Sequence, residues 1–330
     1  MPTRDKILIA VVIIISLGIL AANHDGVIAA GSSEGGFDRS FNVNGAVNLN
    51  LENGSGSVNI HRGVTDKVEV HAKVRATNWF SGSDDEIQKI EQNPPVEQRG
   101  NTIRIYRPEP RDTFNHVSIA YDISVPEETT VNSSTGSGSQ TVDGVKGPVE
   151  ARSGSGSVNL SNIGSEVKAR TGSGHIRLDH INGKADVETG SGGVTANSVA
   201  GGSHLRTGSG GIDFSQTAPG DIDAETGSGH IKLEGVEGSV RAQAGSGSIS
   251  VDGKPKGEWE FHSGSGGIDV RTSGDVGLDL YARTSSGHVD VDPPMTIESS
   301  RLNNREVRGK IRGGGVSLQA TTGSGSIHIQ

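Results

Sequence analysis

Two aspartates toward the C-terminus have the residue type and spacing for carboxylate chemistry. Asp269 and Asp290 occupy the same place in successive copies of a repeated pattern, and Asp252 and Asp292 lie near them. If the copies stack as neighbouring strands, the two carboxylates lie about 5 Å apart, the separation used by retaining glycosidases. These copies lack the aromatic platforms and basic clamps expected of a sugar subsite. We therefore expect solvated surface charge, with a polysaccharide hydrolase or lyase and a weak cation site as alternatives.

Three histidines share one position after a glycine turn and raise the question of a metal site. The alignment places His175, His230 and His288 three repeats apart each time. At about 4.8 Å per repeat they are about 14 Å apart, too far for one ion held at about 2 Å from each ring. A calcium β-roll is not expected either, because its aspartate position holds Ile or Val here. The sequence therefore predicts no metal ligand, and it assigns no catalytic residue, cofactor-binding residue or cofactor.

The composition argues against a large globular core and against several classes of function. The chain has 330 residues, with 50 glycines, only six Phe, three Tyr and two Trp, and no cysteine. Without cysteine, disulfides, thiol catalysis and zinc–thiolate sites are excluded. The net charge of −9 disfavours nucleic acid as the partner, because phosphate binding needs a concentrated basic face. A thin, repetitive core fits these numbers best.

A regular repeat supplies the elements that must position these side chains. Gly-Ser-Gly begins at residues 136, 154, 172, 190, 208, 227, 245 and 264, so the period is 18 or 19 residues. A fixed period of this size is typical of a solenoid, in which each unit buries its apolar face only against its neighbours.

Each repeat predicts two short strands joined by the glycine turn. In residues 167–178 (VKARTGSGHIRL) apolar or small residues alternate with polar ones on both sides of the turn. A third inward-facing residue follows the second strand in several repeats: Ile163, Ile181, Val199 and Val236. The fold class predicted is all-β, a parallel β-solenoid of coils of about 18 residues, expected to be right-handed.

Two outward-facing patterns recur from coil to coil. The serine of each Gly-Ser-Gly turn is expected to form a hydroxyl ladder or to satisfy turn amides: Ser155, Ser173, Ser191, Ser209, Ser228 and Ser246. The first strand carries charges whose sign alternates between coils: Lys168 and Arg170, Asp186 and Glu188, His204 and Arg206, Asp223 and Glu225, then Arg241, Glu260 and Arg283. Stacked coils would pair opposite charges, so we interpret this face as one that fixes the register.

The N-terminal residues indicate export. Arg4 and Lys6 precede an apolar run at residues 7–22, which spans about 24 Å as a helix against the ~30 Å of a bilayer core. Residues 1–30 are therefore predicted to be a signal peptide or a membrane anchor, with both possibilities open. Residues 31–36 are predicted to be a flexible linker; their match to the serine-hydrolase pattern Gly-x-Ser-x-Gly neither follows a strand nor opens a helix.

The remaining chain divides into two predicted regions. Residues 37–132 lack the regular period and are expected to form an irregular β cap, with a short helix opened by the capping box at residues 83–86. Residues 133–330 are predicted to be the solenoid repeats, interrupted by an irregular insertion near residues 293–312.

Three passages resemble the bacterial putative-adhesin β-strand repeat family, a domain of unknown function, over roughly residues 37–330. Residues 51–60 (LENGSGSVNI) resemble its opening strand and turn, and residues 121–126 (YDISVP) its step into the repeats. Residues 313–329 (GGGVSLQATTGSGSIHI) resemble its closing coil. The family often has Gly-Asp where this chain has Gly-Ser, Gly-His or Gly-Gly. The resemblance implies an exported envelope protein without known catalytic residues.

These observations predict a non-enzymatic protein of the bacterial cell envelope, outside the cytoplasm. It would act as an adhesin or scaffold that presents its solenoid surface to an envelope polysaccharide or protein. A second alternative, besides the carbohydrate-active enzyme, is an accessory protein in envelope stress or signalling that acts through a membrane partner. Contact with the membrane would be made through residues 7–22 if they are not cleaved.

Overall fold

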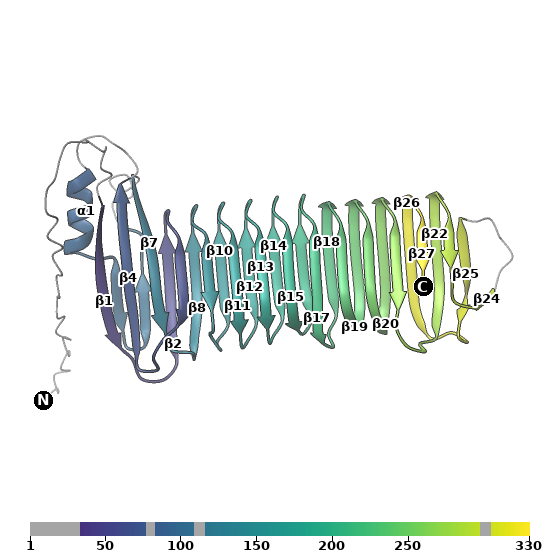
Figure 1. Cartoon of the computed structure of the whole chain (residues 1–330), viewed down its shortest axis with the longest axis horizontal. Helices are drawn as coiled ribbons and strands as arrows, with labels where there is room; N and C mark the ends of the chain where they lie inside the picture. Colours follow the sequence, from purple (N-terminus) through teal and green to yellow (C-terminus); the bar gives the residue numbers. More distant parts are fainter. Residues whose placement is uncertain (1–33, 77–82, 109–115, 298–304) are drawn as a thin grey trace, which may run out of the picture.

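The computed structural model describes residues 34–76, 83–108, 116–297 and 305–330. These residues form a long stack of β-strands with a short helix near one end (Figure 1). The predicted signal or anchor at residues 1–30 lies outside the described residues. Within the described part, none of the helical structure has the length and apolar character needed to span a bilayer.

The middle of the chain winds into two rows of parallel strands. The first row contains β8 (Thr129–Thr135), β10 (Val149–Ser153), β12 (Val167–Thr171), β14 (Ala185–Thr189), β16 (Ser203–Thr207) and β18 (Ile222–Ser228). The second row contains β9 (Gln140–Asp143), β11 (Val158–Ile163), β13 (Ile176–Ile181), β15 (Val194–Ala200) and β17 (Ile212–Ala218). The long strands β19 (Ile231–Ser246) and β20 (Ile249–Ser265) run through both rows.

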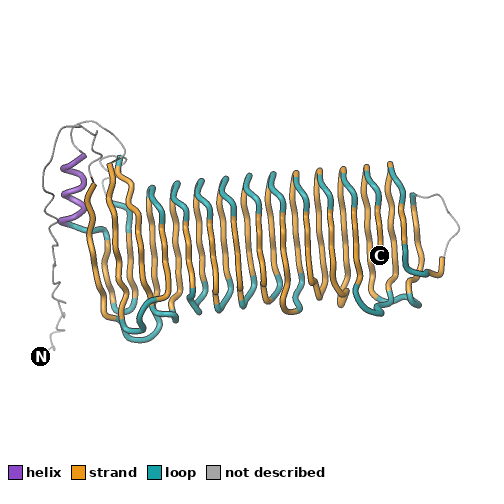
Figure 2. The backbone as a smooth tube through the Cα atoms, viewed as in Figure 1, coloured by secondary structure: helices purple, strands orange, loops and turns teal. Residues whose placement is uncertain are grey.

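Register partners in these rows lie one period apart in the sequence. Val158 pairs with Ile176, and Ile176 with Val194. The turns that join the strands recur at both edges of the stack (Figure 2). The predicted all-β parallel solenoid is therefore confirmed.

The core is a narrow column inside the coils. The inward residues of β11 and β13 are almost completely buried, as are the third inward residues Ile163, Ile181, Val199 and Val236. Asn162 and His180 precede the first two of these with φ of 54° and 55°, which turns the chain inward at that corner. The alternation read from the sequence thus identified the core correctly.

The C-terminal coil is inserted into the stack and does not close it. The strands concerned are β21 (Ile268–Thr272), β22 (Leu278–Ser286), β23 (Val289–Val291), β26 (Val316–Ser324) and β27 (Ile327–Ile329). β26 pairs with β20 on one side and β22 on the other, while β27 lies between β21 and β23. Residues 313–329, which resemble the family's last coil in sequence, therefore lie inside the stack in space.

The end of the stack is covered by antiparallel strands. β25 (Glu306–Ile311) pairs with β22, and β24 (Met295–Ile297) pairs with β25. Both come from the predicted irregular insertion, so this insertion protects the last strand edge of the first row.

At the N-terminal end, too, the order of the strands in the stack differs from their order in the sequence. β2 (Val47–Asn53) lies between β6 (Thr102–Ile105) and β8, and β3 (Val58–Arg62) lies between β7 (Val117–Val125) and β9. β4 (Lys67–Ala76), β1 (Glu34–Asn42) and β5 (Val96–Arg99) add antiparallel pairs.

The expected helix is α1 (Ser83–Gln92), which buries Ile87 and Ile90 beside β1 and β4 (Figure 1). Residues 34–36, expected to be linker, belong to β1. A Cβ at Gly35 would lie 2.4 Å from Ile87 Cγ2, so glycine at this position allows α1 to pack closely.

Neighbouring coils approach closely at the Gly-Ser-Gly turns, which recur at a spacing of 18 or 19 residues. A Cβ on Gly174 would lie 2.1 Å from the carbonyl oxygen of Gly156 in the preceding coil, and one on Gly172 would lie 2.4 Å from that of Gly154. The glycines of this turn are therefore needed for space between coils.

The hydroxyl ladder exists, but the residue before Gly-Ser-Gly forms it. Thr171 Oγ1 donates to the carbonyl of Gly156 at 2.9 Å and accepts from the amide of Gly174 at 3.2 Å. The same contact with the glycine carbonyl of a neighbouring coil recurs at Ser153, Thr189, Thr207, Thr226, Ser263, Thr284 and Thr322. The turn serines that were expected to do this, such as Ser173, are exposed.

Candidate functional site

The structure separates the two aspartates that motivated the glycosidase alternative. Asp269 on β21 is in register with His328 on β27, and His328 is in register with Asp290 on β23. The inserted C-terminal coil therefore doubles the spacing between Asp269 and Asp290 to about 9.6 Å. Their predicted position in neighbouring coils is wrong, and the close pair required for a retaining glycosidase is not formed.

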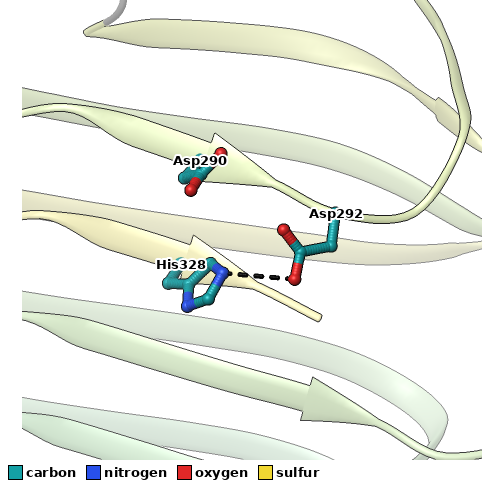
Figure 3. Close-up of side chains that lie close together, drawn as sticks. All are labelled: Asp290, Asp292 and His328. Carbon is teal, nitrogen blue, oxygen red and sulfur yellow. Dashed lines mark ion pairs between the residues drawn. The ribbon is translucent and has the colours of Figure 1, made fainter.

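The same insertion brings together a cluster of potential metal ligands from two separate parts of the sequence. Asp290, Asp292 and His328 each offer a ligand atom, and these atoms all lie within 4.8 Å of one another. His328 Nε2 lies 3.4 Å from Asp292 Oδ2 (Figure 3). Both aspartates are exposed, and the His328 side chain is 34% exposed. The cluster therefore lies open to solvent at the junction of two coils.

Neighbouring side chains hold the imidazole of His328 in place. The Gln330 amide nitrogen lies 3.2 Å from His328 Nδ1, and Gln330 Oε1 accepts a hydrogen bond from Arg271 Nε at 2.9 Å. Arg271 also forms an ion pair with Asp269, with 3.4 Å between Nη2 and Oδ1. The guanidinium that could have neutralised the cluster is thus bound to Asp269 and Gln330.

A second polar pair lies one turn away on the same coils. Ser326 Oγ lies 2.9 Å from His288 Nδ1. Among the described residues, no carboxylate forms a hydrogen bond or ion pair with His288, so the pair lacks the third member of a catalytic triad. The arrangement gives no support for nucleophilic catalysis.

The three histidines of the turn position remain apart, as the sequence predicted, but one interval is longer. From His230 to His288 the stack passes through coils that begin with Ile249, Ile268 and Ile327. The interval is four coils and not three, because the C-terminal coil is inserted. They do not form a metal site together.

His175 differs from the other two histidines because it is partly buried. Its Nε2 lies 3.0 Å from Thr195 Oγ1. Burial lowers the pKa of His175, the positive charge of Arg177 lowers it further, and Asp213 opposes the change. His175 therefore favours its neutral form at neutral pH.

Several of the alternating charges of the first row form the predicted ion pairs, but Arg283 does not stack on Glu260 as predicted, because β26 lies between β20 and β22. Arg170 contacts Asp186 at 3.3 Å and Glu188 at 3.2 Å in the next coil, and Arg206 contacts Glu225 at 3.2 Å. His204–Asp223 and Arg241–Glu260 continue the pattern at 3.1 and 3.7 Å. Each pair is half exposed, so its contribution is about 0.2–1 kcal/mol, and the main effect is to disfavour slipped registers.

A shallow groove crosses the beginning of the same strands. Its volume is about 700 Å³, and Ala185, Gly201, Gly202 and Ser203 form its small-residue floor. Charged side chains border it: Glu166, Lys168, Lys184, Asp186, His204 and Asp221. The hydroxyl of Ser203 is buried and has no hydrogen-bond partner.

These features define a parallel β-solenoid with inserted terminal coils. The family model described as Toastrack DUF4097 matches residues 48–223 and 199–330. The chain therefore belongs to this family, as the resemblance in its repeat and turn motifs predicted.

Comparisons with individual proteins add little. No curated protein matches the chain. A solved structure described as a putative adhesin from Bacteroides fragilis has 12% identity and a TM-score of 0.36, covering 90% of this chain and 98% of its own. Another, described as a putative cell adhesion protein from Clostridium sporogenes, has 15% identity and a TM-score of 0.22, covering 91% and 99%. These scores are too low to carry an argument.

Proposed function

We propose that this protein is a non-enzymatic, exported protein of the bacterial cell envelope that acts as an adhesin or scaffold. The observation that carries the proposal is the outer face of the first row, where charges paired from coil to coil run from Arg170 to Glu260 and a groove lies at the beginning of three of its strands. Such a face presents repeated, rigidly spaced polar groups to an extended polymer. Export is supported by the basic residues and apolar run at residues 4–22.

Binding without cleavage is the property that tests this function. The purified protein is sedimented with isolated peptidoglycan, outer envelope material and common polysaccharides at low and high salt, and the same tubes are assayed for released reducing ends. We expect saturable binding to one polymer class without release. Release of sugar ends would instead identify an enzyme, and failure to sediment with any of these polymers would contradict the adhesin role.

A charge-reversal substitution in the groove tests whether the groove is the surface that binds the polymer. Lys184 borders the groove, whereas Lys232 lies on the second row and pairs with Glu234 at 2.7 Å. We expect Lys184→Glu to weaken sedimentation with the bound polymer and Lys232→Glu to leave it unchanged. Equal effects of the two substitutions would mean that the groove is not the binding surface.

A reporter enzyme that is active only outside the cytoplasm, fused after residue 36, tests export. Activity is expected with the natural segment, and its loss is expected when charged residues replace part of residues 7–22. An inactive natural fusion would contradict export while leaving the polymer-binding result intact.

A further inference from the structure

The Asp290, Asp292 and His328 cluster contains the donor atoms of a transition-metal site. Asp290 and Asp292 are two residues apart, so their side chains project from the same face of the chain. His328 projects beside them from the adjacent strand β27. Among the described residues, this is the one group in which three or more potential ligands lie within 4.8 Å of one another.

We propose that Asp290, Asp292 and His328 bind a divalent transition-metal ion, with Zn²⁺ as the probe. This inference does not depend on the proposed envelope function. An imidazole combined with carboxylates favours Zn²⁺, Co²⁺ or Ni²⁺ over Ca²⁺ and Mg²⁺, which prefer oxygen ligands alone. Three protein ligands leave a fourth tetrahedral position for water.

The backbone of the site is fixed while its carboxylates can still adjust. The Asp292 amide donates to the carbonyl of Ile329 at 2.9 Å, and the Ile327 amide donates to that of His288 at 3.0 Å. Donors on one ion at about 2.1 Å are roughly 3.0–3.4 Å apart, so the cluster must contract by side-chain rotation. The exposed aspartate side chains can make this rotation without disturbing the strands.

The electrostatics of the cluster favour a cation. Asp290 has no ion-pair or hydrogen-bond partner among the described residues, and Arg271 is held by Asp269 and Gln330. Binding through His328 Nε2 places the ring proton on Nδ1, so the Gln330 carboxamide must rotate to present its oxygen there. Arg271 then loses its hydrogen bond to Gln330 and keeps its ion pair with Asp269. In the part of the chain that the structure describes, Asp292 is paired with the imidazole of His328 alone.

A bound ion would join the C-terminal coil to the coil that covers it. β23 and β27 are both three-residue strands, so few backbone hydrogen bonds connect them. An ion that binds only the folded stack stabilises it in proportion to the logarithm of its free concentration. Zn²⁺ is therefore expected to raise the melting temperature of the full chain.

Another pair on the same row provides a matched control. His230 and Asp213 form a similar ion pair at 3.1 Å on neighbouring coils, and no described residue offers them a third ligand. Substitution of His230 therefore removes an equivalent imidazole–carboxylate contact without touching the proposed site.

Calorimetric titration with ZnCl₂ tests the proposal on the full-length protein and on the variants His328→Gln, Asp292→Asn and His230→Gln. We expect one site in the wild type, at least about 10-fold weaker binding in the first two variants, and unchanged affinity in His230→Gln. Titration with CaCl₂ is expected to give at least about 10-fold weaker binding.

The melting temperature without metal, measured on each variant, establishes that it remains folded. The proposal is overturned if the wild type shows no saturable Zn²⁺ binding. It is equally overturned if His328→Gln binds as tightly as the wild type, or if Ca²⁺ binds as tightly as Zn²⁺.

Discussion

Substitution of Thr171 by valine tests whether the buried hydroxyl ladder stabilises the stack. The Thr171 side chain is buried, and its hydroxyl links the carbonyl of Gly156 to the amide of Gly174. Valine keeps the branched shape but leaves both backbone groups without this partner. At about 1–2 kcal/mol for each buried unsatisfied group, the expected loss is roughly 2–4 kcal/mol.

The loss should be local, because each coil of a solenoid contacts mainly its neighbours. Hydrogen exchange is therefore the assay, with urea unfolding as a global check. The amides of Gly174 and its neighbours are expected to exchange roughly 30- to 1,000-fold faster in Thr171→Val. Ser173→Ala, which changes an exposed hydroxyl in the same turn, is the control. Equal exchange in the two variants would refute the assignment of the ladder to Thr171.

Three further predictions follow from the same coils. Gly174→Ala is expected to lower the free energy of unfolding by about 1–3 kcal/mol or more in urea titrations, because its Cβ would lie 2.1 Å from a neighbouring carbonyl oxygen. Arg206→Glu is expected to cost about 1 kcal/mol and the added change Glu225→Arg to restore most of it, as measured by melting temperature. Because burial lowers the pKa of His175, the unfolded chain takes up this proton first as the pH falls. Stability is therefore lost below about pH 6.5, and His175→Asn should reduce the pH dependence of unfolding.

The pitch and the core could be predicted because they are local properties of each repeat. Every coil must place apolar residues inward at the same points, so residues such as Leu160 and Leu178 show the pattern without knowledge of the partner coil. The charge pairs follow from the same reasoning, since Arg206 and Glu225 are one period apart. In the middle of the chain the coils stack in the order of the sequence, so the predicted core residues and the predicted charge pairs are both correct there.

The order of the terminal coils could not be predicted in this way. β26 repeats the same motif as the other coils, so its residues fit between β20 and β22 as well as at the end. Nothing in a local pattern distinguishes these positions, because all register partners in a parallel stack are alike. His328 was missed for this reason, although its outward position in Ile327-His328-Ile329 matches that of Asp269.

In the first row the insertion has a physical advantage, whereas β23, at the end of the second row, pairs only with β27 among the described strands. A terminal coil at the end of the stack would expose a parallel strand edge, which can pair with other chains. Here β2 and β26 each have neighbours on both sides, and β25 covers the outer edge of β22. The C-terminal coil lies between the strands of residues 249–272 and those of residues 278–291. Asp290 and His328 therefore become neighbours only in the completed stack, so metal binding at this cluster would report that the C-terminal coil has been inserted.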